Sequence, residues 1–143
     1  MTITFRTPNS EKEYEDYFNF RWENLRKPLG LKHGSEQDDL ENDAFQIAAF
    51  KNNIIIAVGR LQTEKDSTAR IRYMAVDQKL RNQGIGSKLL EKLETIAKTE
   101  KVKTCWLLAR ETAILFYLKN NYFIEGEANS ELKIKHQRME KNL

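Results

Sequence analysis

The most informative stretch of the chain lies between residues 71 and 87, where a strand pattern leads into a helix pattern. It reads Ile71-Arg72-Tyr73-Met74-Ala75-Val76, then a polar loop, then Arg81-Asn82-Gln83-Gly84-Ile85-Gly86-Ser87. Apolar residues at helical spacing follow to about Lys101. Glycines at a helix start leave the backbone amides accessible, and the partial positive charge of a helix N-terminus attracts anions. The stretch therefore predicts a phosphate-binding turn, flanked by the basic residues Arg81 and Lys88.

Two familiar phosphate-binding loops do not fit this stretch. The nucleotide-binding P-loop requires Gly-x-x-x-x-Gly-Lys-Ser/Thr, which the chain lacks. The dinucleotide fingerprint requires a third glycine, where this chain has Leu89, and it places the glycines directly after the strand. A solvated loop arginine is the simpler alternative for Arg81.

The segments around the turn predict an α/β fold. Residues 45–50, 54–62 and 69–76 are rich in β-branched and aromatic residues and are expected to form antiparallel strands. Residues 104–109 form a nearly unbroken apolar run, which is typical of a strand buried on both faces. A strand, a long helix and a second strand in succession imply a parallel pair within a mixed sheet.

The two ends of the chain add helices and strands to this unit. Ser10 and Glu13 form a capping-box pattern before an apolar stripe that ends at Pro28. We expect a second, short helix to begin at Ser35. A further helix over 112–120, ended by Asn121, and two closing strands at 122–124 and 132–139 complete the prediction.

Composition bounds the remaining possibilities. The 143 residues suffice for one domain spanning 1–143, and the single cysteine, Cys105, forms no internal disulfide and is expected in the core. No signal peptide or apolar run long enough to span a membrane is visible, so we expect a cytoplasmic protein with no membrane partner. His33 and His136 stand apart without metal-ligand spacing, so we expect no metal.

Charge gives little support to nucleic-acid binding. The net charge is +3, with −1 over residues 1–76 (11 basic, 12 acidic) and +4 over residues 77–143 (13 basic, 9 acidic). A solvated helix face explains this distribution, and surface aromatic residues are not interleaved with the basic ones. We therefore expect no nucleic-acid partner.

Two motifs resemble those of the GNAT superfamily of N-acyltransferases. Arg81-Asn82-Gln83-Gly84-Ile85-Gly86, after the strand end Met74-Ala75-Val76, is similar to the family's acyl-CoA-binding motif Arg/Gln-x-x-Gly-x-Gly/Ala. The segment 113–122, Ala-Ile-Leu-Phe-Tyr-Leu-Lys-Asn-Asn-Tyr, resembles the family's Ala-x-x-Phe-Tyr-x-Lys-x-Gly-Phe. The two motifs with their surroundings span about residues 69–123.

The resemblance implies a fold, a cosubstrate and site residues. The fold would be a mixed, mostly antiparallel sheet with one splayed parallel pair, flanked by about four helices. Acetyl-CoA would be the acyl donor, with Tyr117 as the general acid that protonates the leaving thiolate. The implied cofactor-binding residues are Met74, Ala75, Val76, Arg81, Asn82, Gln83, Gly84, Ile85, Gly86 and Ser87.

The chain also departs from the family's pattern. Arg110 stands where many members have asparagine, and Asn121 replaces the usual glycine. No acidic residue occurs in 69–76, where some members place the catalytic base. His33, expected in a loop that borders the acceptor pocket in this family, is a candidate base.

These observations predict an acetyl-CoA-dependent N-acetyltransferase that acts on a primary amine, by direct attack in a ternary complex. A small-molecule acceptor is favoured, and a protein or peptide acceptor stays open. The alternative is a non-catalytic acyl-CoA-binding or regulatory module. The sequence does not identify the amine, the general base or the oligomeric state, for which a homodimer through the closing strands is one option.

Overall fold

A computed structural model describes residues 2–128, 132 and 134–143 of the chain. These residues form one seven-stranded sheet in the order β1-β2-β3-β4-β5-β7-β6. The strands are β1 (Ile3–Arg6), β2 (Phe45–Lys51), β3 (Ile54–Thr63), β4 (Thr68–Val76), β5 (Thr104–Arg110), β6 (Phe123–Ala128) and β7 (His136–Asn142). The α-helices are α1 (Glu11–Leu25), α2 (Ile85–Thr99) and α3 (Ile114–Lys119).

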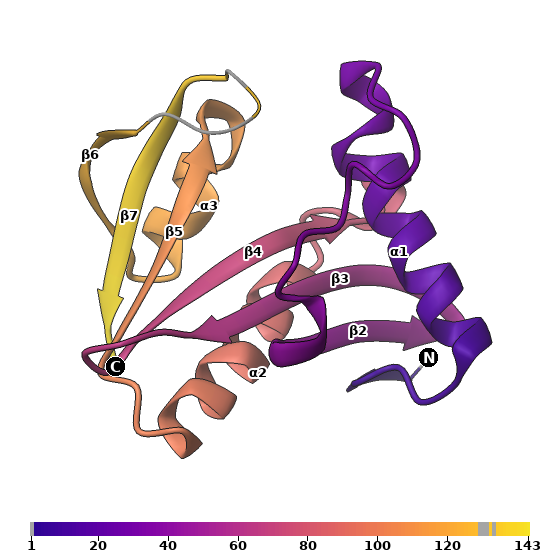
Figure 1. Cartoon of the computed structure of the whole chain (residues 1–143), viewed down its shortest axis with the longest axis horizontal. Helices are drawn as coiled ribbons and strands as arrows, with labels where there is room; N and C mark the ends of the chain where they lie inside the picture. Colours follow the sequence, from indigo (N-terminus) through magenta and orange to yellow (C-terminus); the bar gives the residue numbers. More distant parts are fainter. Residues whose placement is uncertain (1, 129–131, 133) are drawn as a thin grey trace.

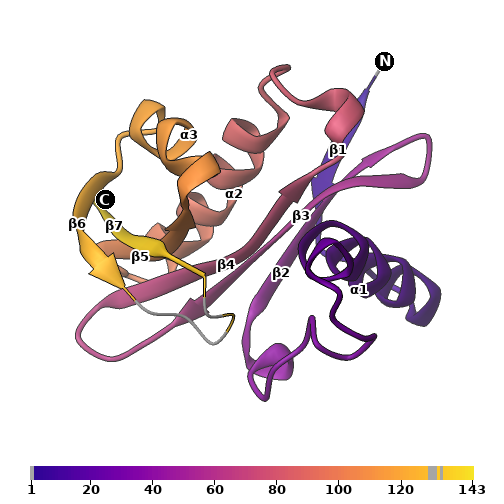
Figure 2. The same cartoon turned by 90° about the horizontal axis from the view of Figure 1, so that it is seen from above.

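The helices cover both faces of the sheet. Helix α1 lies on one face, and α2 and α3 lie on the other (Figure 2). Leu89, Leu90 and Leu93 of α2 are buried in the larger apolar core, where each contributes about 1.5–3 kcal/mol. A smaller core on the α1 face is centred on Tyr17 and Val58.

Strands β4 and β5 are the only parallel neighbours among the described strands, which confirms the predicted mixed sheet. Their pairing extends over three positions, from Thr68↔Thr104 to Arg70↔Trp106. Beyond these pairs the two strands diverge (Figure 1). The sheet therefore opens into a V-shaped gap between the carboxyl-terminal halves of β4 and β5.

Several local predictions are confirmed. The Ser10 hydroxyl accepts a hydrogen bond from the Glu13 amide (3.1 Å) and caps α1. Asn52 and Asn53 adopt left-handed backbone angles (φ 53° and 64°) in the β2–β3 hairpin. Asn121 is also left-handed (φ 71°), one residue after the C-cap of α3.

The prediction of a helix beginning at Ser35 is wrong. Between Ser35 and Ala44 the chain forms turns and a single 3-10 turn, Glu41–Asp43. The carboxylates of Asp38 and Glu41 bind buried arginines instead of a helix N-terminus. The described residues accordingly contain three α-helices rather than about four.

Strand boundaries at both ends of the chain also differ from the prediction. The short strand β1 was not expected, and it adds to the sheet beside β2. Strand β7 begins at His136 rather than at residue 132, and residue 133 of the expected strand lies outside the described residues. Polar residues dominate β7, so its apolar pattern is weak. No described helix is both long enough and apolar enough to cross a membrane.

Candidate functional site

The turn between β4 and α2 has the backbone conformation of an anion-binding loop. After the 3-10 turn Gln78–Leu80, left-handed residues occur at Asn82 (φ 66°) and Gly84 (φ 81°). Left-handed residues within a tight turn direct nearby amides to one side and create concavities for anions. Glycine adopts this conformation at Gly84 without strain, and a Cβ there would meet open space.

The first amides of α2 are available to a ligand. The helix begins at Ile85, and its N-cap Gly84 supplies no side-chain hydrogen bond. The Lys88 amide donates to the Gly84 carbonyl (3.0 Å), so the amides of Ile85, Gly86 and Ser87 precede the first intrahelical bond. Arg81, Asn82 and Gln83 lie exposed beside them. This arrangement is suited to a phosphate or diphosphate.

The divergence of β4 from β5 leaves part of the β4 backbone without a strand partner on one side. The Asp77 amide donates to the Ile56 carbonyl of β3 (2.8 Å). Because backbone groups alternate along an antiparallel strand, the N–H and C=O of Val76 point toward the β5 side, into the gap. An extended ligand arm can form hydrogen bonds there. Met74 packs on the α2 face, whereas Ala75 is buried on the α1 face.

Helix α3 carries Tyr117 close to the amide-lined turn. A Cβ added at Gly86 would lie 3.1 Å from the Phe116 ring and 3.4 Å from a methyl group of Val76. Gly86 therefore allows β4, α2 and α3 to meet. The Tyr117 ring packs edge-on against Phe116 (5.0 Å between centroids) and Tyr122 (5.7 Å).

The Tyr117 hydroxyl is protonated and has no hydrogen-bond partner among the described residues. The side chain is 7% exposed, and burial raises its pKa above the ordinary value of a tyrosine. Among the described residues, none forms a hydrogen bond with this hydroxyl. Two of the other buried tyrosines do have partners: Tyr17 donates to Gln46 (2.7 Å), and Tyr122 donates to Glu94 (2.8 Å).

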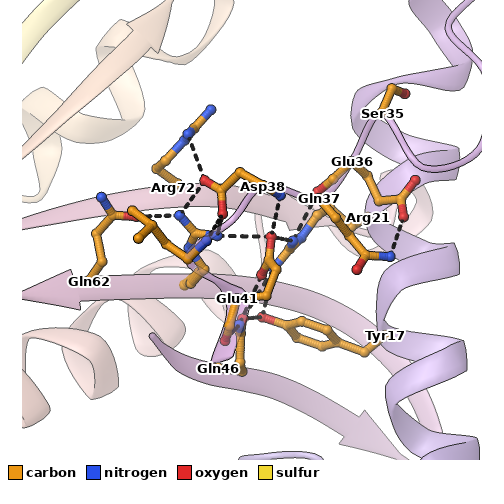
Figure 3. Close-up of polar contacts among 12 residues, drawn as sticks. Tyr17, Arg21, Ser35, Glu36, Gln37, Asp38, Glu41, Gln46, Gln62 and Arg72 are labelled. Carbon is orange, nitrogen blue, oxygen red and sulfur yellow. Dashed lines mark hydrogen bonds and ion pairs between the residues drawn. The ribbon is translucent and has the colours of Figure 1, made fainter. Parts of the chain in front are cut away.

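On the α1 face of the sheet, an ion-pair network that the sequence analysis did not predict lies beside β4 (Figure 3). Asp38 accepts two hydrogen bonds from Arg60 (2.7 and 2.8 Å) and one from Arg72 (3.1 Å). Glu41 pairs with Arg21 and with Arg60, both at 2.9 Å. Arg21 and Arg60 are fully buried, so the two carboxylates compensate charges that would otherwise destabilise the fold.

Tyr73 lies at the centre of this network in a strained conformation. It occupies a bulge in β4 opposite Gly59 and has a left-handed φ of 60°, which is unusual for an aromatic residue. The guanidinium carbons of the arginines of the network lie 4.0–4.9 Å from its ring centroid (Arg21, Arg60, Arg72). Cation–π contacts of this kind stabilise the bulge at the edge of the gap.

One signal for this network was present in the sequence. Arg21 lies four residues after Tyr17 and four before Leu25, within the apolar stripe of α1. A charge at such a position predicts a buried ion pair. Its carboxylate partner, Glu41, follows 20 residues later in an irregular segment, and no local pattern connects the two residues.

The remaining candidates from the sequence lie away from the gap or in the core. The exposed His33 stacks on Trp22 (3.5 Å between centroids), and Trp22 is not part of the apolar core on the α1 face. Cys105 is fully buried, as predicted, and burial raises the pKa of its thiol to about 12. The described part of the chain contains no cluster of three His, Cys, Asp or Glu residues able to hold a metal.

Comparison with known proteins identifies the family. Residues 8–122 match the sequence profile of the Acetyltransferase (GNAT) family. A GNAT acetyltransferase from Staphylococcus aureus Mu50 shares the fold with a TM-score of 0.81, at 21% identity over 99% of both chains.

Two similar structures contain coenzyme A. One is an aminoglycoside 6′-N-acetyltransferase (TM-score 0.81, 15% identity, 99% of this chain and 97% of that one). The other is the PaiA N-acetyltransferase of Thermoplasma acidophilum (TM-score 0.77, 18% identity, 100% of both chains). The profile match covers most of the chain and includes both the amide-lined turn and Tyr117, so the chain belongs to the GNAT acetyltransferase family.

Proposed function

We propose that the protein transfers an acetyl group from acetyl-CoA to the primary amine of a small molecule, by direct attack in a ternary complex. The observation that carries the proposal is the uncapped start of α2, beside a β4 strand whose backbone is open toward β5. Such a site can hold the diphosphate and the extended arm of coenzyme A together. The coenzyme A complexes of two proteins with this fold support the same assignment.

Within the site, Met74, Ala75 and Val76 would line the pantetheine arm. The amides of Ile85, Gly86 and Ser87 would bind the diphosphate, with Arg81, Asn82 and Gln83 at its outer side. The exposed position of Arg81 allows it to contact a phosphate without displacing another partner.

The reaction requires three contributions from the protein. The acceptor amine must lose a proton to solvent before it attacks the thioester carbonyl, and the nitrogen loses a second proton as the amide forms, which restores the proton that the thiolate takes up. The oxyanion that forms needs a donor, and a β4 amide directed into the gap can serve. As the carbon–sulfur bond breaks, the electron pair stays on sulfur, and the Tyr117 hydroxyl can donate its proton to the leaving thiolate.

Calorimetry and a turnover assay test the proposal together. Titration with coenzyme A should release heat with a one-to-one stoichiometry. Thiol release from acetyl-CoA should then depend on an added amine, across a panel of small amines and short peptides. Binding without turnover on any amine would support a non-catalytic acyl-CoA module instead, and preferred turnover of peptides would reassign the acceptor.

A homodimer is a separate proposal about the same protein. The edge strand β6 exposes Phe123 (42%) and Ile124 (47%), and the neighbouring α3 exposes Leu115 (73%). An edge strand with apolar side chains can pair with a second copy. Sedimentation analysis should detect a dimer that Ile124→Lys converts to a monomer, and a monomeric wild-type protein would contradict the proposal.

A further inference from the structure

Arg110 lies beside the gap at the level of the β4 bulge. The last parallel pair is Arg70↔Trp106, and four further residues lead to Met74 on β4 and to Arg110 on β5. The Arg110 guanidinium crosses toward α1, where it donates a hydrogen bond to the Leu25 carbonyl (3.1 Å). Its side chain therefore lies on the α1 face, opposite the face that carries α2 and its amide-lined start.

No carboxylate among the described residues balances the charge of Arg110. No carboxylate of residues 2–128, 132 or 134–143 lies within the 4.0 Å ion-pair distance of its guanidinium. Burial alone accounts for the lowering of its pKa, with no opposing carboxylate. The nearby Arg21, Arg60 and Arg72 all have carboxylate partners.

Arg110 also retains donors for a ligand. A guanidinium has five N–H groups, and the Leu25 carbonyl accepts only from Nη2. The remaining groups have no partner among the described residues, yet none of its nitrogens is a fully buried, unsatisfied atom. They face accessible space while one anchor fixes the orientation of the guanidinium plane.

We propose that Arg110 binds a carboxylate on the acceptor, so that the substrate is an amino acid or another amine carrying a carboxylate. This inference rests on the proposed acetyl transfer and names the class of its acceptor. A planar guanidinium with two adjacent free donors matches a carboxylate in a bidentate geometry. Because Arg110 lies level with the β4 bulge, a carboxylate bound to it would lie next to the unpaired β4 backbone.

The carboxylate belongs to the acceptor rather than to the acyl donor because of the face on which Arg110 lies. The donor's diphosphate is expected at the start of α2, on the far face of the sheet, and its arm would occupy the gap. With the donor in those positions, the α1 face, where Arg110 is anchored, is left for the incoming amine. Succinyl-CoA serves as a probe of the opposite assignment.

Matched substrates test this inference. Thiol release from acetyl-CoA is measured with each amino acid of a panel and with the corresponding amino-acid amide, in which only the carboxylate is neutralised. The wild-type protein should show a kcat/KM for the best acid at least 10-fold above that for its amide. Arg110→Gln should lower kcat/KM for the acid roughly 10- to 100-fold, while activity on the amide stays within about 2-fold. Arg110→Lys should retain part of the preference.

A matched control separates substrate binding from a structural role. Arg138, on β7, stacks on Trp106 (4.1 Å) and pairs with Glu140 (3.0 Å), so Arg138→Gln should leave the acid-to-amide ratio unchanged. Thermal unfolding of Arg110→Gln measures the effect of the lost Leu25 contact.

Three results would overturn the inference while leaving acetyl transfer intact: equal rates on acids and amides, an equal loss on both in Arg110→Gln, or a preference for succinyl-CoA that Arg110→Gln abolishes. If no amine of any charge is acetylated although coenzyme A binds, the proposed function fails, and the assignment of an acceptor fails with it.

Discussion

Two buried tyrosines in edge-to-face contact, Tyr117 and Tyr122, differ in what their hydroxyls bind. Tyr122 donates to Glu94, whereas Tyr117 has no hydrogen-bond partner among the described residues. If Tyr117 protonates the leaving thiolate, Tyr117→Phe should lower kcat by about 100-fold or more. Calorimetry should find the affinity for coenzyme A unchanged, because the backbone amides that bind it are intact.

The partner tyrosine supplies the control. Tyr122→Phe leaves Glu94 with one donor fewer, so it should lower the free energy of unfolding by about 1–2 kcal/mol and retain turnover.

Because burial raises the pKa of Tyr117, its hydroxyl stays protonated to strongly alkaline pH. Ionisation of Tyr117 should therefore cause no decline of kcat below about pH 10. Equal turnover in wild-type and Tyr117→Phe proteins would remove Tyr117 from the mechanism.

Asp38 stabilises the fold in a pH-dependent way. Hydrogen bonds from Arg60 hold the pKa of this carboxyl at about 2, below the ordinary value of 3.8. Because the pKa is lower in the folded state, the stabilisation is complete above about pH 4 and is lost as the pH falls toward 2. Asp38→Asn should lower the free energy of unfolding by about 3 kcal/mol at pH 7, since it leaves the buried Arg60 without its bidentate partner.

Urea unfolding of both proteins at several pH values measures this effect. The difference between wild type and Asp38→Asn should shrink by about 1 kcal/mol between pH 7 and pH 3, because protonated aspartate resembles asparagine. A difference that is constant down to pH 2 would show that the charge of Asp38 is not the source of its contribution.

At the scale of elements, the sequence predicts best what neighbouring residues determine. Ser10 caps α1 by accepting a hydrogen bond from the amide of Glu13, three residues later. Asn52 and Asn53 close a hairpin because asparagine tolerates the left-handed backbone conformation. The amide-lined turn is likewise a contiguous motif, and for that reason the sequence predicts a glycine turn that opens a helix there. Asp38 and Arg60 are 22 residues apart, and nothing near Asp38 shows that its carboxylate binds β3 rather than a helix start. The ion-pair network therefore required the three-dimensional structure.

The contact between α2 and α3 depends on the absence of a side chain at Gly86. A Cβ there would lie 3.1 Å from the Phe116 ring, so Gly86→Ala forces the ring to shift and should lower the free energy of unfolding by about 1–2 kcal/mol. Phe116→Leu removes the atoms in the way. The loss of free energy of unfolding in the double variant should consequently be smaller than the sum of the two single losses. The difference should be at least about 0.5 kcal/mol, as expected for contacting residues.

Chemical denaturation of the four proteins completes this cycle. Gly84→Ala serves as the matched glycine control, because a Cβ at Gly84 meets open space and its effect comes from the left-handed φ of 81°. Phe116→Leu should leave the effect of Gly84→Ala unchanged. Additive effects of Gly86→Ala and Phe116→Leu would show that the two residues do not constrain each other.

For the whole molecule, we propose that the two faces of the sheet serve donor binding and acceptor binding separately. The uncapped start of α2 and Tyr117 lie on one face, while Arg110 and the ion-pair network around Asp38 lie on the other. Strands β4 and β5 diverge beyond their three paired positions, between these two sets of residues. Variants of the network should accordingly change stability, variants of Arg110 should change acceptor use, and variants of the α2 turn should change donor binding.

Thermal unfolding with ligands tests this separation across the molecule. Coenzyme A at about 100 times its dissociation constant stabilises the folded state by roughly 2.7 kcal/mol, and for a chain of this size Tm should rise by roughly 5–10 °C. Pantetheine, which lacks the diphosphate, should give a much smaller shift at the same concentration.

Gln83→Glu places a negative charge beside the free amides with little change of shape, so it should reduce the Tm shift produced by coenzyme A. Asn19→Asp makes the same chemical change on the exposed surface of α1, across the sheet, and should leave that shift intact. If both variants respond to coenzyme A like the wild type, the diphosphate does not bind at the start of α2.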